Sequence, residues 1–157
     1  MTFSGAKLAL FLGPDLLVIL RDDRPDIPWP GRWDLPGGGR EGDEAPQTCA
    51  LRETREEVGL ALRPEDLTWA HSYTRPHGRV WFFAAHLPAA ARGAVRFGME
   101  GQGWRLMPPR LYCDHALAVP HFADQLRRYM AQPGFADALG GHQRGAHKEP
   151  PANSGGR

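Results

Sequence analysis

The chain has 157 residues, a formal net charge of only +1, 41% hydrophobic residues and 24% charged residues. This length predicts one domain with a real hydrophobic core, and the composition is typical of a soluble globular protein. The balanced charge argues against a dedicated binder of nucleic acid polymers, whose basic excess is normally large. A small phosphorylated ligand remains compatible, because it needs only a few local cations or a metal ion.

Targeting and redox signals are sparse in this sequence. The apolar N-terminal run is interrupted by Gly13, Pro14 and Asp15 and lacks the small-residue cleavage site of a signal peptide. No stretch of 18 apolar residues is present that could span a membrane. Two cysteines, Cys49 and Cys113, do not make a disulfide framework. We therefore expect a reducing, cytoplasmic setting and no membrane partner.

The first forty residues predict short strands joined by turns. Residues 7–12 and 16–20 are rich in β-forming side chains and flank a Gly-Pro-Asp turn, a pattern that predicts a hairpin. Residues 21–30 are polar and rich in proline, which is typical of a loop. Residues 33–35 are expected to form no more than a bridging strand, and residues 36–39 an irregular turn.

A helix is predicted from Asp43 to Val58. Asp43 is a suitable N-cap, Pro46 lies in the first turn, where its missing N–H does little harm, and Gly59 stands where helices commonly end. The face expected to pack on a sheet consists of Ala50, Leu51, Thr54 and Val58.

The second half of the chain predicts three more strands and a second helix. Residues 67–73 and 79–87 are expected to be strands joined through a turn, and residues 104–107 one further strand. Residues 89–103 are rich in small side chains and predict an irregular segment. Apolar side chains at helical spacing predict a helix over residues 120–131.

The segment from residue 140 onward differs in composition from the rest. It has no large apolar side chain, so it is expected to be disordered. The chain is accordingly divided into a folded domain over residues 1–139 and a C-terminal tail over residues 140–157.

The predicted helix over residues 43–58 has one densely anionic face. Glu53, Glu56 and Glu57 are spaced i, i+3 and i+4, so their side chains project from the same face and repel each other. A hard divalent cation removes this repulsion, since Mg²⁺ takes oxygen ligands and prefers carboxylates together with substrate phosphates. The glycine-rich turn before the helix can aim a backbone carbonyl at the same ion.

Residues 38–60 read GGREGDEAPQTCALRETREEVGL and resemble the Nudix box, G-x5-E-x7-R-E-U-x-E-E-x-G-U, where U is a bulky apolar residue. The seven fixed positions are filled by Gly38, Glu44, Arg52, Glu53, Glu56, Glu57 and Gly59. Leu60 fills the last U position, whereas Thr54 stands at the first, a mild departure because Thr54 lies on the packing face. A chance match of seven positions has a probability on the order of one in a million.

The resemblance implies an α/β (α+β) fold, an α/β/α sandwich with a mixed β-sheet, over about residues 5–135. It also implies that Mg²⁺ or Mn²⁺ is bound by one carbonyl and three carboxylates, those of Gly38, Glu53, Glu56 and Glu57. Arg52 would orient the carboxylates and Glu44 would hold Arg52. The alternative for Glu44 and Arg52 is a plain ion pair on the helix surface.

A further candidate acid, Glu100, lies in the run GMEGQG at residues 98–103. This run is similar to that of the MutT-like branch of the family, in which a loop glutamate adds a metal ligand or a general base. A glutamate flanked by glycines can approach a crowded metal site closely, and the attacking water needs a base within hydrogen-bond reach. The alternative is an exposed loop residue.

Candidate substrate contacts are cationic and aromatic. Arginine matches phosphate oxygens in bidentate pairs, and the arginines near the expected site are Arg21, Arg24, Arg40, Arg75 and Arg79. Of these, Arg21, Arg40, Arg75 and Arg79 are assigned to substrate binding. Aromatic side chains that could stack on a base, although at strand spacing they more often belong to the core, are Trp29, Trp33, Tyr73 and Trp81. Pro76, sixteen residues after Leu60, resembles a weak marker of ADP-ribose-cleaving members, and a turn-forming role explains it equally. The histidines show no zinc-site spacing.

The expected activity is hydrolysis of the pyrophosphate linkage of a nucleoside diphosphate joined to another group. The first expected substrate is a nucleoside triphosphate, oxidised or unmodified, and the second is ADP-ribose or another nucleotide sugar. The rival from a different class is a Nudix domain that senses a nucleotide without cleaving it. Such a sensor would be expected to have lost a metal carboxylate, and none is missing here. The partner is thus a small nucleotide, and a monomer or homodimer is expected.

Overall fold

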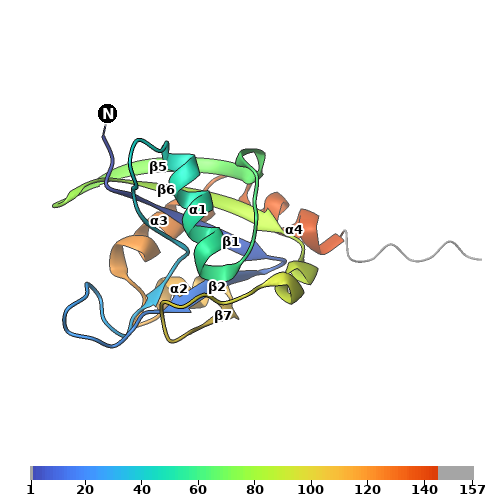
Figure 1. Cartoon of the computed structure of the whole chain (residues 1–157). Helices are drawn as coiled ribbons and strands as arrows, with labels where there is room; N and C mark the ends of the chain where they lie inside the picture. Colours follow the sequence, from blue (N-terminus) through green and yellow to red (C-terminus); the bar gives the residue numbers. More distant parts are fainter. Residues whose placement is uncertain (1, 145–157) are drawn as a thin grey trace, which may run out of the picture.

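The computed structural model describes residues 2–144, and within them seven strands form one mixed sheet (Figure 1). The strands are β1 (Gly5–Leu12), β2 (Asp15–Leu20), β3 (Trp33–Asp34), β4 (Gly37–Gly39), β5 (Leu67–Arg75), β6 (Gly78–Leu87) and β7 (Gly103–Met107). Their order is β3-β2-β1-β6-β5, while β4 pairs with β1 and β7 pairs with β2. Only the β1–β6 pairing among these is parallel.

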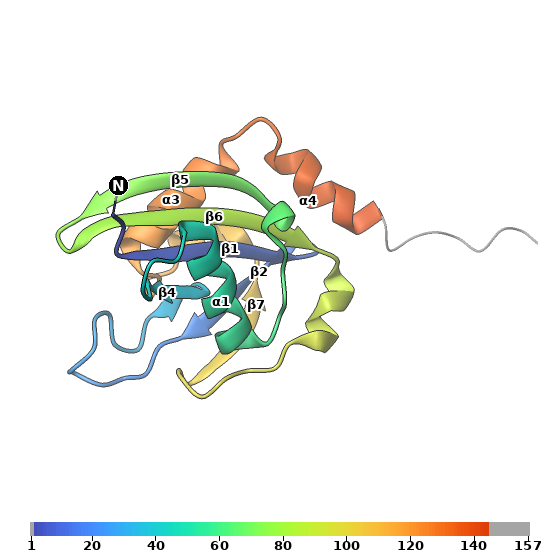
Figure 2. The ribbon, with the colours of Figure 1, turned by 45° about the horizontal axis from the view of Figure 1, so that its top comes forward.

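Helices cover both faces of the sheet (Figure 2). They are α1 (Pro46–Val58), α2 (Pro109–Asp114), α3 (Pro120–Met130) and α4 (Phe135–Arg144), with the short 3-10 turns η1 (Pro64–Asp66) and η2 (Ala89–Ala94). The helix α1 lies on one face, and α2, α3 and α4 lie on the other, which confirms the predicted α/β/α sandwich. None of the helices within residues 2–144 is both long enough and apolar enough to cross a membrane.

The strand β1 shows how one sequence run serves two cores. Successive side chains of a strand point to opposite faces. Leu8 and Leu10 therefore join the core under α1, while Ala9 and Phe11 join the core under α3 and α4. All four are fully buried. The run is apolar at nearly every position because both faces of the strand are covered.

The predicted start of α1 is wrong by three residues. The helix begins at Pro46 with Ala45 as its N-cap, and no side chain caps it, whereas Asp43 lies in the preceding turn. Pro46 at the first position lacks an N–H, which removes one of the donors that a capping side chain would satisfy. The predicted end is confirmed, since Gly59 adopts a left-handed φ of 71° and its N–H donates to the carbonyl of Arg55.

Two other segments are more regular than predicted. Residues 37–39 form the strand β4, paired with β1, and not an irregular turn. The strands β4 and β1 lie so close together that a Cβ atom at Gly37 would collide with the carbonyl oxygen of Ala6. The φ of Gly37 is +135°, a backbone conformation that favours glycine. Residues 89–94 form η2, and α2 was not predicted at all.

The predicted boundary at residue 140 is also wrong, because α4 continues to Arg144 and residues 140–144 are helical. The ring of Phe135 is buried, with centroids 5.7 Å from Phe11 and 5.4 Å from Tyr129. Leu139 packs on the same core one turn later. These contacts anchor the first half of α4, which precedes Gly140 and Gly141. Residues 145–157 lie outside the described residues, so disorder there stays a prediction.

Candidate active site

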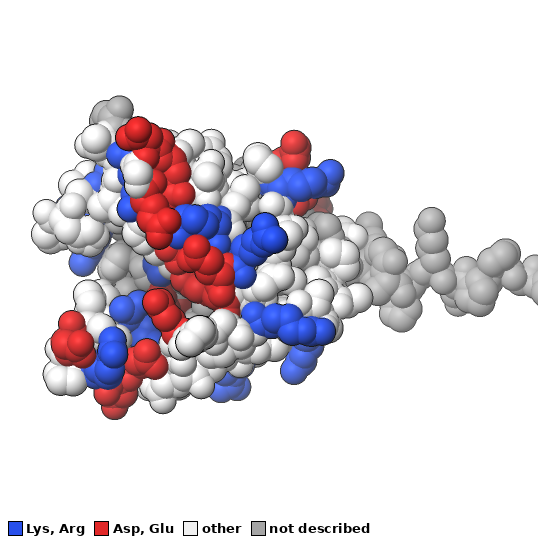
Figure 3. Space-filling model, in the orientation of Figure 1, with Lys and Arg blue, Asp and Glu red and all other residues white. Residues whose placement is uncertain are grey.

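The helix α1 buries a stripe of small side chains and turns its charged side outward. Cys49, Ala50, Thr54 and Val58 are buried against the sheet, and Leu51 is half-buried. Thr54, the departure from the motif, donates its hydroxyl to the carbonyl of Ala50 at 2.7 Å, so its polar group is satisfied inside the helix. The outer side forms a band of acidic side chains with arginines beside it (Figure 3).

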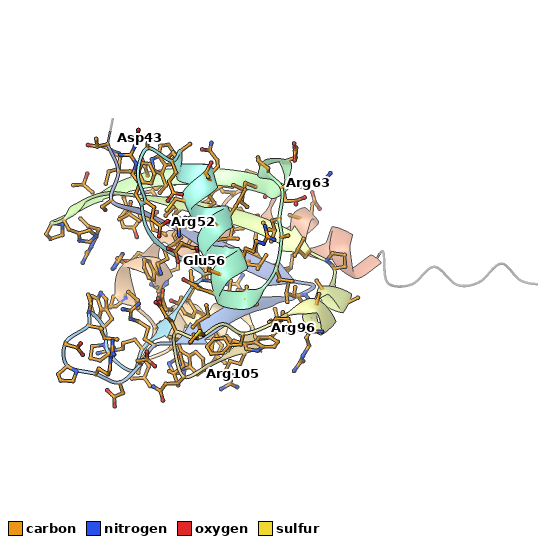
Figure 4. The ribbon with its side chains drawn as sticks, in the orientation of Figure 1. Asp43, Arg52, Glu56, Arg63, Arg96 and Arg105 are labelled. Atoms are coloured by element: carbon orange, nitrogen blue, oxygen red, sulfur yellow. The ribbon has the colours of Figure 1, made fainter. Side chains whose placement is uncertain are left out.

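Arg52 is the centre of an ion-pair network on this band, and Figure 4 shows it on the same side of α1 as Glu56. Its Nε and Nη2 donate to the two carboxylate oxygens of Glu44 at 3.0 and 2.8 Å. This bidentate pair lowers the pKa of Glu44 to about 2. Arg52 also donates to the carbonyl of Gly39 and to Glu53, both at 3.0 Å. The expected contact between Glu44 and Arg52 is present, and its supporting role stays a prediction.

The three predicted metal glutamates have different surroundings. Glu53 and Glu57 line a cavity of about 660 Å³ next to Gly38. Burial is the main cause that raises the pKa of Glu57 to about 8, opposed by the nearby ammonium of Lys7. Glu56 is not among the residues lining this cavity; its side chain is 57% exposed and lies 3.3 Å from Nη1 of Arg52.

The cavity combines carboxylates with cations from several elements. Its charged lining residues are Lys7, Arg21, Asp22, Arg24, Asp34, Glu53, Glu57 and Glu100. Glu100 is thus brought to the same cavity as the helix glutamates, although it lies in a loop far along the chain. Its role as base or ligand stays a prediction.

Sequence reasoning missed the buried pair formed by Lys7 and Asp34. The ammonium of Lys7 lies 3.1 Å from the Asp34 carboxylate and donates to the carbonyl of Gly37 at 3.0 Å. Nη1 of Arg21 donates at 2.8 Å to Oδ2 of the same carboxylate, an oxygen that also accepts from Lys7. The signal was a single charged residue in an otherwise apolar strand. Charges that are buried in this way are normally paired.

Among the four arginines predicted to bind substrate, Arg21 is the one that lines the cavity. Arg40 donates to the carbonyl of Glu44 and lies over the ring of Phe3. Arg79 donates to Ser72, and Arg75 ends β5 away from the lining. Substrate binding by these side chains stays a prediction, and the geometry favours Arg21.

The donor set fits a hard divalent cation. A Cβ atom at Gly38 would lie 2.7–2.8 Å from the carboxylate of Glu53, so a larger residue there would displace that carboxylate from its present position. As the side chains stand, no three His, Cys, Asp or Glu among the described residues are grouped closely enough to hold a metal on their own. Mg²⁺ commonly uses one or two carboxylates with substrate phosphates and waters. Glu53, Glu57 and the Gly38 carbonyl meet that requirement.

Known proteins resemble the chain in both sequence and fold. A "MutT-like protein" of Streptomyces ambofaciens is 41% identical over 59 residues, which are 38% of this chain and 34% of the relative. The matches cover about a third of the length of the first curated relatives, 34%, 38% and 32%.

Two solved structures have a TM-score of 0.64 with this chain. The MutT protein from Methanosarcina mazei is 19% identical, with 81% of this chain and 91% of that chain covered. The Ap4A hydrolase of C. elegans, solved as a binary complex, is 22% identical, with 81% and 96% covered. At such identity the likeness shows the fold alone. A family profile described as NUDIX domain matches residues 4–129. Since that match spans most of the chain, the chain belongs to the NUDIX domain family.

Proposed function

We propose that this chain is a divalent-metal-dependent hydrolase that cleaves the pyrophosphate linkage of a nucleoside diphosphate joined to another group. The observation that carries the proposal is one cavity lined by Glu53, Glu57 and Gly38 together with the cations Lys7 and Arg21. Membership of the NUDIX domain family supports the same reaction class. Carboxylates for a metal and cations for phosphate oxygens are both required by this chemistry.

The glutamates of the cavity and the residues beside them have proposed parts in the reaction. Glu53, Glu57 and the carbonyl of Gly38 would hold Mg²⁺ or Mn²⁺, which when bound supplies charge neutralisation and a more acidic water. Arg52 fixes the carboxylate of Glu53 by its 3.0 Å contact. Glu56 would join the metal ligands only after releasing Arg52.

The loop glutamate and the arginines complete the proposal. Glu100 accepts the proton of the attacking water, because it lines the same cavity as Glu53 and Glu57. Arg21 and Arg24 neutralise the phosphate oxygens of the substrate. Water then attacks one phosphorus, and a nucleoside monophosphate leaves with the remaining phosphate part as the second product.

The proposed substrate is a nucleoside triphosphate, oxidised or unmodified. Support comes from the MutT-like relative and from the position of Glu100 at the cavity. Pro76 lies in the turn between β5 and β6, where a turn-forming role explains it, so it gives ADP-ribose no independent support. The cytoplasmic location and the monomeric or homodimeric state remain predictions.

A turnover screen tests this proposal. Nucleoside triphosphates, ADP-ribose, nucleotide sugars and dinucleoside polyphosphates are incubated with Mg²⁺ or Mn²⁺, and again after exhaustive treatment with EDTA. We expect release of a nucleoside monophosphate that depends on the added ion. Full turnover after EDTA would contradict the metal mechanism. Binding of a nucleotide without turnover of any substrate would instead indicate a sensor.

A further inference from the structure

Lys7 is the one charged residue of β1, and it lies at the border of two cavities. One is the acidic cavity, and the other is a mainly apolar cavity of about 320 Å³ whose walls include Trp29 and His121. A lysine at such a border is expected to contact the phosphates of a substrate, because ammonium groups commonly bind phosphate. The hydrogen bonds of Lys7 indicate a different part.

The ammonium group of Lys7 has no donor left for a ligand. An ammonium carries three N–H donors and no acceptor. In the structure its acceptors are Oδ2 of Asp34 at 3.1 Å, the carbonyl of Leu35 at 3.3 Å and the carbonyl of Gly37 at 3.0 Å. The side chain of Lys7 is also only 12% exposed. A phosphate oxygen would therefore have to displace one of these three acceptors.

Arg21, which lines both cavities as well, differs from Lys7 in this respect. A guanidinium carries five N–H donors. Nη1 of Arg21 donates to Asp34 at 2.8 Å, and its Nε donates to the carbonyl of Pro28 at 2.9 Å. These two bonds use two of the five donors, so Arg21 can bind a phosphate oxygen without releasing either acceptor.

The three acceptors of Lys7 lie in one short segment, residues 34–37, which leads from β3 into β4. The strand β4 consists of three glycines, the residues with the greatest backbone freedom. Lys7 holds the carbonyl of Gly37, while Oε2 of Glu57 accepts from the N–H of the same residue at 3.3 Å. Gly37 is thus held through both of its backbone polar groups, directly before Gly38, whose carbonyl is a proposed metal ligand.

We propose that Lys7 is a positioning residue that acts through Gly37. It sets the place of the Gly38 carbonyl and of the Glu57 carboxylate, and it leaves the phosphate oxygens to Arg21. This inference rests on the proposed function, because the two oxygens matter as metal ligands. Without the ammonium, the carbonyl of Gly37 loses its donor and the glycine strand gains freedom. A metal site whose ligands are held less firmly binds its ion more weakly.

Lys7→Met tests the proposal, because methionine keeps most of the apolar stem and removes the charge and the donors. Binding of Mn²⁺ to the substrate-free protein is followed by electron paramagnetic resonance. We expect the dissociation constant for Mn²⁺ to rise by about tenfold or more, as for other residues that hold metal ligands in place. The sign of the change is informative, since removal of a nearby positive charge would by itself tighten the binding of a cation.

Binding of methylenediphosphonate, a pyrophosphate analogue that is not hydrolysed, separates positioning from phosphate contact. At saturating Mn²⁺, Lys7→Met should bind it within about twofold of wild type. Arg24→Met is the matched variant, because Arg24 lines the acidic cavity and its side chain is 61% exposed. It should weaken methylenediphosphonate binding by about tenfold and leave the Mn²⁺ constant unchanged. With a substrate from the turnover screen, Lys7→Met should show a lower kcat at an unchanged KM.

NMR on the wild type decides the question if Lys7→Met does not fold. The ¹⁵N-labelled ammonium of Lys7 should keep its chemical shift when Mg²⁺ and methylenediphosphonate are added together, whereas the guanidinium signals of Arg21 should move. A shift of the Lys7 signal that requires methylenediphosphonate would overturn the proposal.

Unchanged or tighter Mn²⁺ binding in folded Lys7→Met would also overturn the positioning role, as would a tenfold loss of its methylenediphosphonate affinity. Failure of the proposed function gives different results. A wild type that binds no Mn²⁺ would overturn the metal mechanism and this inference together. Weaker Mn²⁺ binding in Lys7→Met without turnover of any substrate by the wild type would overturn the hydrolase and leave the positioning role standing.

Discussion

The layer formed by α1 and the layer formed by α2, α3 and α4 cover opposite faces of one sheet, yet they carry different kinds of side chain (Figure 2). The α1 layer buries small residues such as Cys49 and Ala50 and directs its glutamates outward. The opposite layer buries large rings, among them Phe122, Tyr129 and Phe135. Both layers complete the core, but the first also places several carboxylates close together on its outer side. Substitutions in the α1 layer should therefore affect activity, and those in the other layer should affect stability.

The largest expected effect is that of Glu57→Gln. It keeps the size of the side chain and removes the negative charge that would hold a metal, so kcat should fall by about 10²- to 10⁴-fold. Because burial raises the pKa of Glu57 to about 8, the ionised carboxylate disfavours folding at neutral pH. The metal-free variant should therefore melt no lower than wild type at that pH.

Glu65→Gln is the matched control for this substitution, since Glu65 is an exposed glutamate of η1 that does not line the cavity. It should change neither kcat nor the melting temperature. If Glu57→Gln instead lowers the melting temperature and leaves kcat unchanged, Glu57 serves as a structural ion-pair partner. The α1 layer would then respond to substitution in the same way as the opposite layer.

The reverse pattern is expected for Phe135→Ala in α4. Phe135 is 8% exposed and packs against Phe11 and Tyr129, so its truncation should lower the free energy of unfolding by about 3–5 kcal/mol. Turnover per folded molecule should stay close to wild type at low temperature. Denaturant unfolding gives the loss, and Phe135→Leu should lose less, because it keeps most of the apolar volume. An unchanged unfolding free energy would mean that α4 contributes little to the core.

Glu100→Gln tests whether the loop before β7 takes part in the reaction together with the glutamates of α1. If Glu100 is the base, kcat should fall by about 10²-fold while the melting temperature stays unchanged. Steady-state kinetics over a range of metal concentrations separates this effect from weaker metal binding. A kcat within a small factor of wild type would remove Glu100 from the site and leave the helix glutamates in place.

The helix glutamates could be predicted from sequence because their geometry is local. Spacing within one helix already places Glu53 and Glu57 on one face, and the turn that precedes it is only a few residues away. The predicted sandwich followed from the same motif. The predicted N-cap at Asp43 was wrong although it concerns the same helix. The exact first residue of a helix depends on the backbone conformation of single residues, which spacing alone does not give.

The parts that could not be predicted depend on contacts between distant residues. Lys7 is a lone charge in an apolar run, and it lies buried beside Asp34 only because β1 pairs with β2 and β2 pairs with β3. The helix α4 contains two glycines, which favour disorder, but Phe135 anchors it on Phe11 from the other end of the chain. The cavity lined by Trp29 likewise exists only once α3 is in place.

The smallest expected effect concerns His121, which belongs to α3 and lines the apolar cavity. Burial lowers the pKa of His121 to about 4, whereas the same side chain in the unfolded chain titrates near 6.5. The unfolded state therefore takes up the proton first as the pH falls from about 6.5 to about 4, and stability is lost in that window. His121→Phe should flatten this loss when unfolding is followed by denaturant titration across the same pH range. Tyr73→Phe removes the 2.8 Å hydrogen bond to the ring but keeps its burial, so most of the slope should persist. A slope in His121→Phe equal to that of wild type would show that other groups on this layer set its acid sensitivity.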